Sequence, residues 1–363
     1  MIDKYYKEFK VRDYMDEEGL SNSLRKDIID CSLGTNPFIE ENLINNYLME
    51  STCEINKYPS LQYELLKKEL LKFYKDVLCE GVNKDNIAFG SGTMGIIRNL
   101  GQFLMRDGKK VLGCAPQFPR FISEVELQKG IYEYYTLEKK NNYKFITEEF
   151  IKMIDDSYDV ISIENPNNPT GQIIGIKDIE KIVAKAKENN IIVLVDEAYG
   201  DYMSKSNSAI TLVNKYNNII VVRSASKFYG LPNHRVGYMF ADKELIKIYN
   251  EIAMPFPFSD LSASIFIKAL QSDAKIEYTK SMVVEAKEKI CNRIKKENYI
   301  YTSIDIPIFT IKSDKYENLT KKLMEEGIIA ENCSYFINLD STYARLRINK
   351  DYEKVIEILI RIL

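Results

Sequence analysis

Five short apolar runs, each followed at once by a polar loop, constrain the fold of this 363-residue chain more than any other feature. The runs are continuous instead of alternating, which is typical of strands that helices cover on both faces. Amphipathic segments such as IKDIEKIVAKAKENN lie between them. This succession predicts an α/β fold with a mostly parallel sheet flanked by helices. The runs are NIAF (86–89), KVLGC (110–114), DVISI (159–163), IIVLV (191–195) and IIVV (219–222).

The chain changes character after about residue 252. Long helical segments are followed there by the strand-like stretches IPIFTIK, IIAENC and ARLRIN and by a closing helix, DYEKVIEILIRIL. This order of elements predicts a smaller α+β domain. We therefore expect an N-terminal segment (1–45) that packs with the small domain, a large domain (46–251) and a small C-terminal domain (252–363).

Composition and charge exclude several classes of protein. A net charge of −3 gives no electrostatic attraction to nucleic acid or to an anionic membrane. The single histidine, His234, excludes a zinc site with two imidazoles, and the six scattered cysteines form no CxxC pair, so we expect no metal. The polar N-terminus does not resemble a signal peptide, and no apolar run is long enough to span a bilayer. These features predict a cytoplasmic protein.

The loops after the five runs carry most of the chemically useful side chains. They read GSGTMG, APQFPRF, ENPNNPTG, DEAYGDY and RSASK. Ligands of parallel α/β sheets bind beyond the carboxyl ends of the strands, so we expect these loops to meet at one site. Together they offer partners for a phosphate, a flat ring, a ring nitrogen, a ring hydroxyl and an aldehyde. Pyridoxal phosphate is one molecule that has all five.

Several motifs extend the pattern from about Asp30 to the C-terminus. SLGTNPF, KYPS, APQF, NPNNPTG, VDEAY and SKFYGLP with RVGY follow one another in that order. In these motifs the chain resembles the fold-type I pyridoxal-phosphate enzymes, the class I and II aminotransferase superfamily. Within it, the chain looks most like histidinol-phosphate aminotransferases and threonine-phosphate decarboxylases. The resemblance implies a homodimer with shared active sites that moves an amino group between an L-amino acid, or an amino-alcohol phosphate, and a 2-oxo acid.

The resemblance also implies roles for the cofactor-binding residues. Lys227 would bind the cofactor aldehyde covalently and then move the proton at the substrate Cα. Asp196 would keep the pyridine nitrogen protonated, while Tyr199 and Asn168 would bind the ring hydroxyl and Phe118 would stack on the ring. The residues expected to hold the phosphate are Ser91, Gly92, Thr93, Ser224, Ser226 and Arg235, with Tyr58 reaching it from the neighbouring subunit.

Residues for the substrate are expected in two other segments. In the pattern RLRI, the resemblance gives Arg345 the role of binding the substrate carboxylate. Arg347 points to the same face of a strand, and it either binds a second anionic group or lies in a solvated stripe. Gly34 and Asn36 match the segment that lines the substrate side.

Two other functions remain compatible with the sequence. The first is decarboxylation of the threonine-phosphate type, although that family's His-Gly-Gly element is missing and Glu331, Asn332 and Cys333 stand where it has arginines before a cysteine. Met94 and Gly95 likewise depart from the acidic residues common in histidinol-phosphate enzymes. The second is a non-catalytic module that senses an amino acid. The sequence does not identify the substrate side chain.

Overall fold

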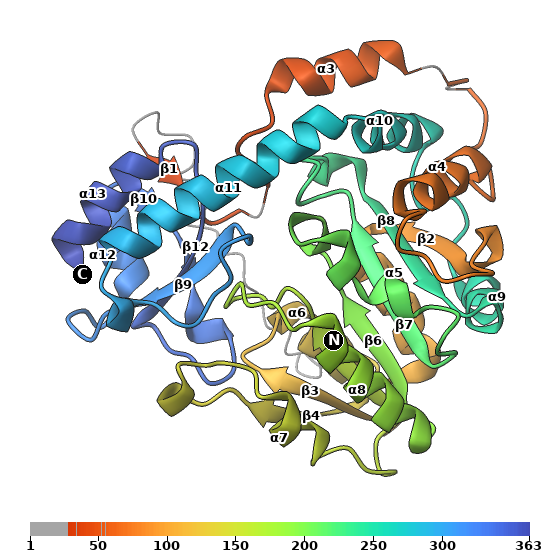
Figure 1. The fold of residues 1–363 in the computed structure, drawn as a ribbon, viewed down its shortest axis with the longest axis horizontal. Helices are drawn as coiled ribbons and strands as arrows, with labels where there is room; N and C mark the ends of the chain where they lie inside the picture. The colour runs from red at the N-terminus through yellow and green to blue at the C-terminus, as the bar shows by residue number, and fades with distance from the viewer. Residues whose placement is uncertain (1–27, 34, 52, 55) are drawn as a thin grey trace, which may run out of the picture.

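The computed structural model describes residues 28–33, 35–51, 53–54 and 56–363. A seven-stranded sheet lies at the centre of the larger part of the molecule (Figure 1), with the strand order β2-β8-β7-β6-β5-β3-β4. All five predicted strands belong to this sheet, and β4 and β8 join them. The strands are β2 (Ile87–Ser91), β3 (Lys110–Ala115), β4 (Ile131–Thr136), β5 (Val160–Glu164), β6 (Ile192–Asp196), β7 (Ile219–Ser224) and β8 (Val236–Ala241).

The directions of the strands decide where their loops lie. Strands β4, β3, β5, β6 and β7 pair in parallel. Strand β8 is antiparallel to both β7 and β2, so β2 runs in the same direction as the parallel strands. The carboxyl ends of all five predicted strands therefore lie at one edge of the sheet. The predicted α/β fold with a mostly parallel sheet is confirmed.

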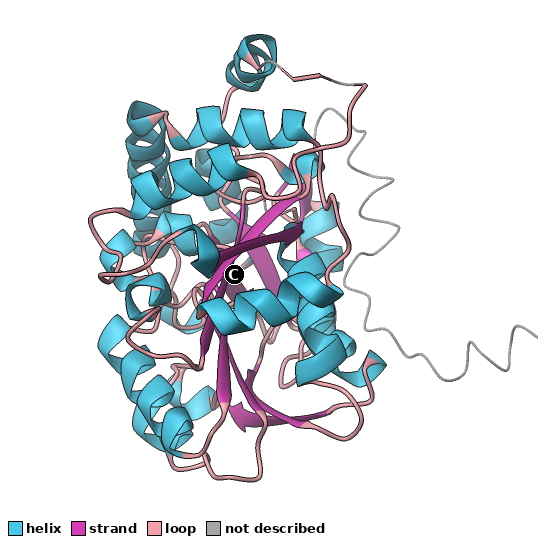
Figure 2. Ribbon diagram, turned by 90° about the vertical axis from the view of Figure 1, so that its right-hand side faces the viewer, coloured by secondary structure: helices cyan, strands magenta, loops and turns pink. Residues whose placement is uncertain are grey.

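Helices cover both faces of this sheet, which explains the continuous apolar runs. In β6, Val193 and Val195 belong to one buried cluster and Leu194 belongs to another, because successive side chains point to opposite faces. Figure 2 shows the strands between layers of helices. The first cluster includes side chains of α4 (Glu64–Tyr74) and α8 (Ile176–Glu188), and the second includes those of α5 (Gly92–Leu104), α6 (Pro119–Leu127) and α9 (Lys243–Ile252).

A smaller antiparallel sheet lies apart from the first and has the order β11-β12-β9. The 21-residue helix α11 connects the two parts of the molecule and packs against α13 (Figure 1). A separate parallel pair, β1 with β10, ties residues 29–30 to the smaller part. The domain boundaries at 45 and 251 stay a prediction. The elements of this part are β1 (Ile29–Asp30), α11 (Asp273–Arg293), β9 (Ile308–Lys312), α12 (Leu319–Glu325), β10 (Ile328–Ile329), β11 (Glu331–Asn332), β12 (Tyr343–Arg347) and α13 (Tyr352–Ile362).

Three further helices complete the described chain. Helix α3 (Glu41–Glu50) lies against α10 (Asp260–Leu270), which also contacts α4, and α7 (Thr147–Ile151) packs near α8. None of the helices in the described residues is long and apolar enough to cross a lipid bilayer. The described residues also contain no group of three or more histidine, cysteine or acidic side chains arranged to hold a metal ion.

Candidate active site

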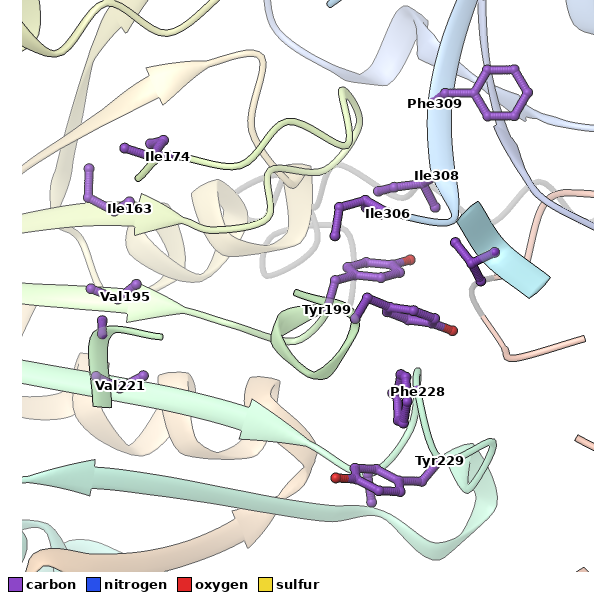
Figure 3. Close-up of a cluster of buried hydrophobic side chains, with 14 of the residues drawn as sticks. Ile163, Ile174, Val195, Tyr199, Val221, Phe228, Tyr229, Ile306, Ile308 and Phe309 are labelled. Carbon is purple, nitrogen blue, oxygen red and sulfur yellow. The ribbon is translucent and has the colours of Figure 1, made fainter. Parts of the chain in front are cut away.

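Most of the residues predicted to bind the cofactor lie where the five strands end. The loop after β6 carries Tyr199, which lies beyond the strand end and faces Ile306 and Ile308 of the smaller part, and the loop after β7 carries Phe228 (Figure 3). Each strand of this set ends in, or is followed by, one of the polar loops identified in the sequence. The site is therefore bordered by both parts of the molecule.

Lys227 and Tyr199 come together from neighbouring strands. The Lys227 Nζ lies 5.5 Å from the centroid of the Tyr199 ring. Tyr199 is only 3% exposed, and its hydroxyl has no hydrogen-bond partner among the described residues. A buried hydroxyl without a partner is costly, so a ligand oxygen or nitrogen is the natural acceptor for it.

Asp196 ends β6 and has its carboxyl group buried beside this pair. Its Oδ1 accepts a hydrogen bond of 2.9 Å from the backbone N–H of Ala198, which fixes the orientation of the carboxyl group. Burial raises the pKa of Asp196 to about 7, and the charge of Lys227 acts in the opposite direction. A cation placed against this carboxyl group would favour its ionised form, because opposite charges at close range stabilise each other.

A second group of residues forms a cradle suited to an anion. Ser224 ends β7, and its hydroxyl lies 2.9 Å from that of Ser226 and accepts the Ser226 backbone N–H at 3.0 Å. Across the sheet, the N–H of Gly92 donates to the carbonyl of Arg235 at 2.9 Å. The Arg235 guanidinium lies over Gly92 so closely that an added Cβ would be 2.4 Å from Nη2.

The first turn of α5 adds backbone donors to this cradle. Ser91 is the N-cap, and Gly92 and Thr93 are the first two helical residues. Helix N-termini have free N–H groups and a partial positive charge, which favour a phosphate. Gly92 has a φ of +70°, a conformation that favours glycine. On another loop, Phe118 is the N-cap of α6 after β3, and its N–H donates to the Glu164 carboxylate at 3.2 Å.

Arg345 lies on β12 and reaches across to the large sheet. Its Nη1 donates to Oδ1 of Asn168 at 2.8 Å, and its Nη2 donates to the carbonyl of Ser32 at 2.6 Å. It also forms an ion pair with Glu331 on the adjacent strand β11. The predicted cofactor residue Asn168 and the predicted substrate residue Arg345 are thus in direct contact.

Arg347 does not lie in a solvated stripe, so that interpretation is wrong. The residue is 5% exposed, and its guanidinium donates to the carbonyl oxygens of Asp30, at 2.8 Å, and Thr35. It therefore binds the N-terminal segment to β12. Asn36 holds the same segment on the other side, because its amide donates to the carbonyl of Phe228 at 2.6 Å.

Two predicted site residues are not part of this arrangement as described. Gly34 lies outside the described residues. Tyr58 is 84% exposed and stacks on Phe256, with ring centroids 5.2 Å apart. Its predicted contact with a neighbouring subunit stays a prediction.

The sequence interpretation missed the buried ion pairs that support the site. Arg223 precedes Ser224 on β7, and its guanidinium binds Glu197 at 2.6 Å and Asp201 at 2.8 Å, with less than a tenth of each side chain exposed. These contacts join the β6 and β7 loops, and removing one partner of such a pair costs about 3 to 5 kcal/mol. Arg223 is the first residue of the motif RSASK, but no local pattern indicates a partner 26 residues away.

Glu164 was also missed. It ends β5 in register with Asp196, and burial together with the Asp196 carboxylate raises the pKa of Glu164 well above its usual value. Its position at a strand end, next to the motif NPNNPTG, was the available signal. Like charges in neighbouring buried positions disfavour each other's ionised forms.

The residues present fit a pyridoxal-phosphate cofactor in two independent ways. The buried Tyr199 hydroxyl lacks a partner among the described residues, as expected for a group that binds the ring hydroxyl of a ligand. At Gly92 the absence of a Cβ lets the guanidinium of Arg235 lie against the start of α5, where an added Cβ would be 2.4 Å from Nη2. Hydroxyl, backbone N–H and guanidinium donors are the set that suits a phosphate dianion.

Comparison with protein families decides the assignment. The model of the family "Aminotransferase class I and II" matches residues 26–362. This chain belongs to that family. It is a pyridoxal-phosphate-dependent aminotransferase, as the motifs implied.

Individual relatives agree with the family. A histidinol-phosphate aminotransferase of Methanocaldococcus jannaschii is 28% identical over 340 residues, which cover 92% of this chain and 89% of the relative. The crystal structure of the histidinol-phosphate aminotransferase from Clostridium acetobutylicum superposes with a TM-score of 0.81 at 22% identity, over 92% of this chain and 99% of the other. The L-threonine-O-3-phosphate decarboxylase from Porphyromonas gingivalis has a TM-score of 0.75 at 20% identity, over 92% and 98%. These two structures share the fold.

Proposed function

We propose that this chain moves an amino group between an L-amino acid, or an amino-alcohol phosphate, and a 2-oxo acid, with Lys227 as the residue that transfers protons at the substrate Cα. The observation that carries the proposal is the convergence of Lys227, Asp196 and Tyr199 at the adjacent ends of β6 and β7. The bound cofactor supplies an electron sink for the substrate carbanion. The protein supplies the base, the fixed carboxylate and the anion cradle.

Each residue has a distinct task in this proposal. The Lys227 amine holds the cofactor and then accepts and returns the Cα proton. Asp196 keeps a positive charge on the ring, and Tyr199 and Asn168 orient the ring through its hydroxyl. Phe118 would stack on the face of the ring. Arg345 binds the substrate carboxylate, supported by its position beside Asn168.

The phosphate would be held from three elements. Ser91, Gly92 and Thr93 contribute the N-terminus of α5, Ser224 and Ser226 contribute hydroxyls after β7, and Arg235 contributes a guanidinium. Because these groups are fixed by backbone and by the buried Arg223 pair, the cofactor would be oriented before substrate arrives.

We further propose that the enzyme is a cytoplasmic homodimer in which Tyr58 completes the partner's site. Four large apolar side chains are exposed on two adjoining segments, at Tyr58, Leu61, Leu65 and Met254. The segments are joined by the stacking of Tyr58 on Phe256. An exposed apolar patch of this kind supports an interface with another protein surface.

The experiment that tests the proposed function separates the two half-reactions. The holoprotein is mixed with single L-amino acids, and also with histidinol phosphate and phosphothreonine, and the visible absorption of the cofactor is followed. We expect the aldehyde form to be converted to the amine form by at least one substrate, and to be restored by a 2-oxo acid. Release of carbon dioxide without formation of a 2-oxo acid would instead identify a decarboxylase.

A further inference from the structure

Glu331 and Arg345 form a buried ion pair at the substrate side of the site. They lie directly opposite each other on β11 and β12, and they are 7% and 4% exposed. A substrate carboxylate that binds Arg345 must therefore share the guanidinium with a carboxylate of the protein. The surroundings of Arg345 therefore contain a negative charge as well as a positive one.

One oxygen of Glu331 has no hydrogen-bond partner in the described part of the chain. Its Oε1 is buried and has no hydrogen-bond donor within reach among the described residues, Lys227 included. Lys227 is close enough for its charge to act on Glu331, so this carboxylate belongs to the same site. Buried carboxylate oxygens are almost always satisfied by a donor, and one that is not satisfied calls for a ligand.

A second buried glutamate, Glu197, provides a comparison, because it forms a buried ion pair in which both carboxylate oxygens have partners. Glu197 binds Arg223 and is 0% exposed. Its Oε2 also accepts the hydroxyl of Ser208, and its Oε1 accepts the N–H of Ala209 at 2.7 Å. Both oxygens of Glu197 are thus occupied. Glu331 differs from it because its Oε1 has no hydrogen-bond donor among the described residues.

From this difference we propose that Glu331 is a specificity-determining residue that selects amino acids with a positively charged distal group, such as α,ω-diamino acids. The inference rests on the proposed function. When the substrate carboxylate binds the Arg345 guanidinium, the positive charge of Arg345 is shared between two carboxylates. The negative charge of Glu331 is then no longer fully balanced, and an ammonium group on the same substrate would balance it. A substrate with a phosphate or a second carboxylate would instead add a negative charge beside Glu331.

The test compares ligands that differ in one group. α-Methyl-lysine, α-methyl-norleucine and α-methyl-glutamate lack the Cα hydrogen, so they can exchange reversibly with Lys227 on the cofactor but cannot be transaminated, and calorimetry gives each apparent dissociation constant. We expect wild type to bind α-methyl-lysine at least about tenfold more tightly than α-methyl-norleucine. Glu331→Gln should remove this preference, leave α-methyl-norleucine within about threefold, and improve the binding of α-methyl-glutamate.

Matched variants guard against a structural explanation. Glu326→Gln alters another glutamate of the smaller part, paired with Arg361 on the surface, and should change none of the three constants. Glu331→Asp keeps the charge and should keep the preference for α-methyl-lysine with weaker binding. If Glu331→Gln does not fold, Glu331→Asp and the comparison of the three ligands in the wild type still test the role of Glu331.

Three results would overturn the proposal. Wild type could bind α-methyl-lysine no better than α-methyl-norleucine, it could prefer a neutral amide such as α-methyl-glutamine over α-methyl-lysine, or Glu331→Gln could weaken all ligands equally. Failure of the proposed function looks different, because then no reactive amino acid would convert the cofactor from its aldehyde form to its amine form. Turnover of norleucine with no preference for lysine would refute only the role of Glu331.

Discussion

The proton on Asp196 connects the chemistry of the site with the stability of the protein. Burial raises its pKa to about 7 from 3.8, and the neighbouring Glu197 carboxylate adds to the effect. The unfolded chain releases this proton near pH 4, whereas the folded protein keeps it until about pH 7. The contribution of Asp196 to stability is therefore fully present below pH 4 and is lost as the pH rises through 7.

We expect this loss to be measurable in the cofactor-free protein. Between pH 5 and pH 7 the free energy of unfolding of wild type should fall by about 2 to 3 kcal/mol more than that of Asp196→Asn, since one pKa unit is worth about 1.4 kcal/mol. Urea titrations of both proteins at the two pH values measure the difference. Parallel changes in the two proteins would mean that Asp196 is ionised in the folded state without a cofactor.

The positions of the residues expected on the cofactor side could be predicted from sequence, because each lies at or just after the end of a recognisable strand within a specific motif. Lys227 and Asp196 are examples, since both stand at the end of a buried run. The contacts of Arg345 with the Ser32 carbonyl and of Arg347 with the Asp30 carbonyl could not be predicted, because these partners lie 313 and 317 residues away in the chain. The cross-strand pair of Glu331 with Arg345 depends on register, which the sequence of a strand as short as the two-residue β11 does not determine.

At the scale of elements, the N-terminus of α5 depends on a glycine. Gly92 combines a φ of +70° with a close approach of Arg235, whose Nη2 would lie 2.4 Å from a Cβ added at this position. An L-residue in this conformation costs roughly 1 to 2 kcal/mol, and the added methyl group displaces the guanidinium from the anion cradle. A Cβ at position 92 would therefore disturb both the start of α5 and the proposed phosphate site.

Gly92→Ala should therefore weaken cofactor binding by about tenfold or more, which corresponds to about 1.4 kcal/mol. Spectroscopic titration of the apoprotein with pyridoxal phosphate measures the dissociation constant. Gly175→Ala is the matched control, because Gly175 is the N-cap of α8 and an added Cβ would have no atom of the described residues within 4 Å. Equal affinities for Gly92→Ala and wild type would contradict the proposed cradle.

The elements that sequence analysis found and missed differ in their surroundings. Strands β3, β5, β6 and β7 are covered on both faces, so their apolar runs are continuous. Strand β4 lies at the sheet edge with exposed and buried residues mixed, which hides it in the sequence. Strand β8 is fully buried but follows the cofactor loop so closely that RVGY was interpreted only as a motif.

For the molecule as a whole, the exposed apolar patch predicts a dimer. We expect light scattering to give the mass of two chains, and Tyr58→Ala to weaken cofactor binding without changing the circular dichroism spectrum. Tyr134→Ala is the control, because Tyr134 is also partly exposed, at 40%, but lies on β4. A monomer that binds the cofactor tightly and transfers amino groups would refute the shared site.

The account as a whole depends on one covalent bond, between Lys227 and the cofactor. Borohydride reduction of the holoprotein makes that bond permanent, and mass spectrometry of the proteolytic peptides then identifies the modified residue. We predict a single pyridoxyl-phosphate adduct on Lys227, in the peptide that follows β7, and no adduct in Lys227→Ala. An adduct on a different lysine of the wild-type protein, or no adduct on a protein that is active, would contradict the assignment of the site.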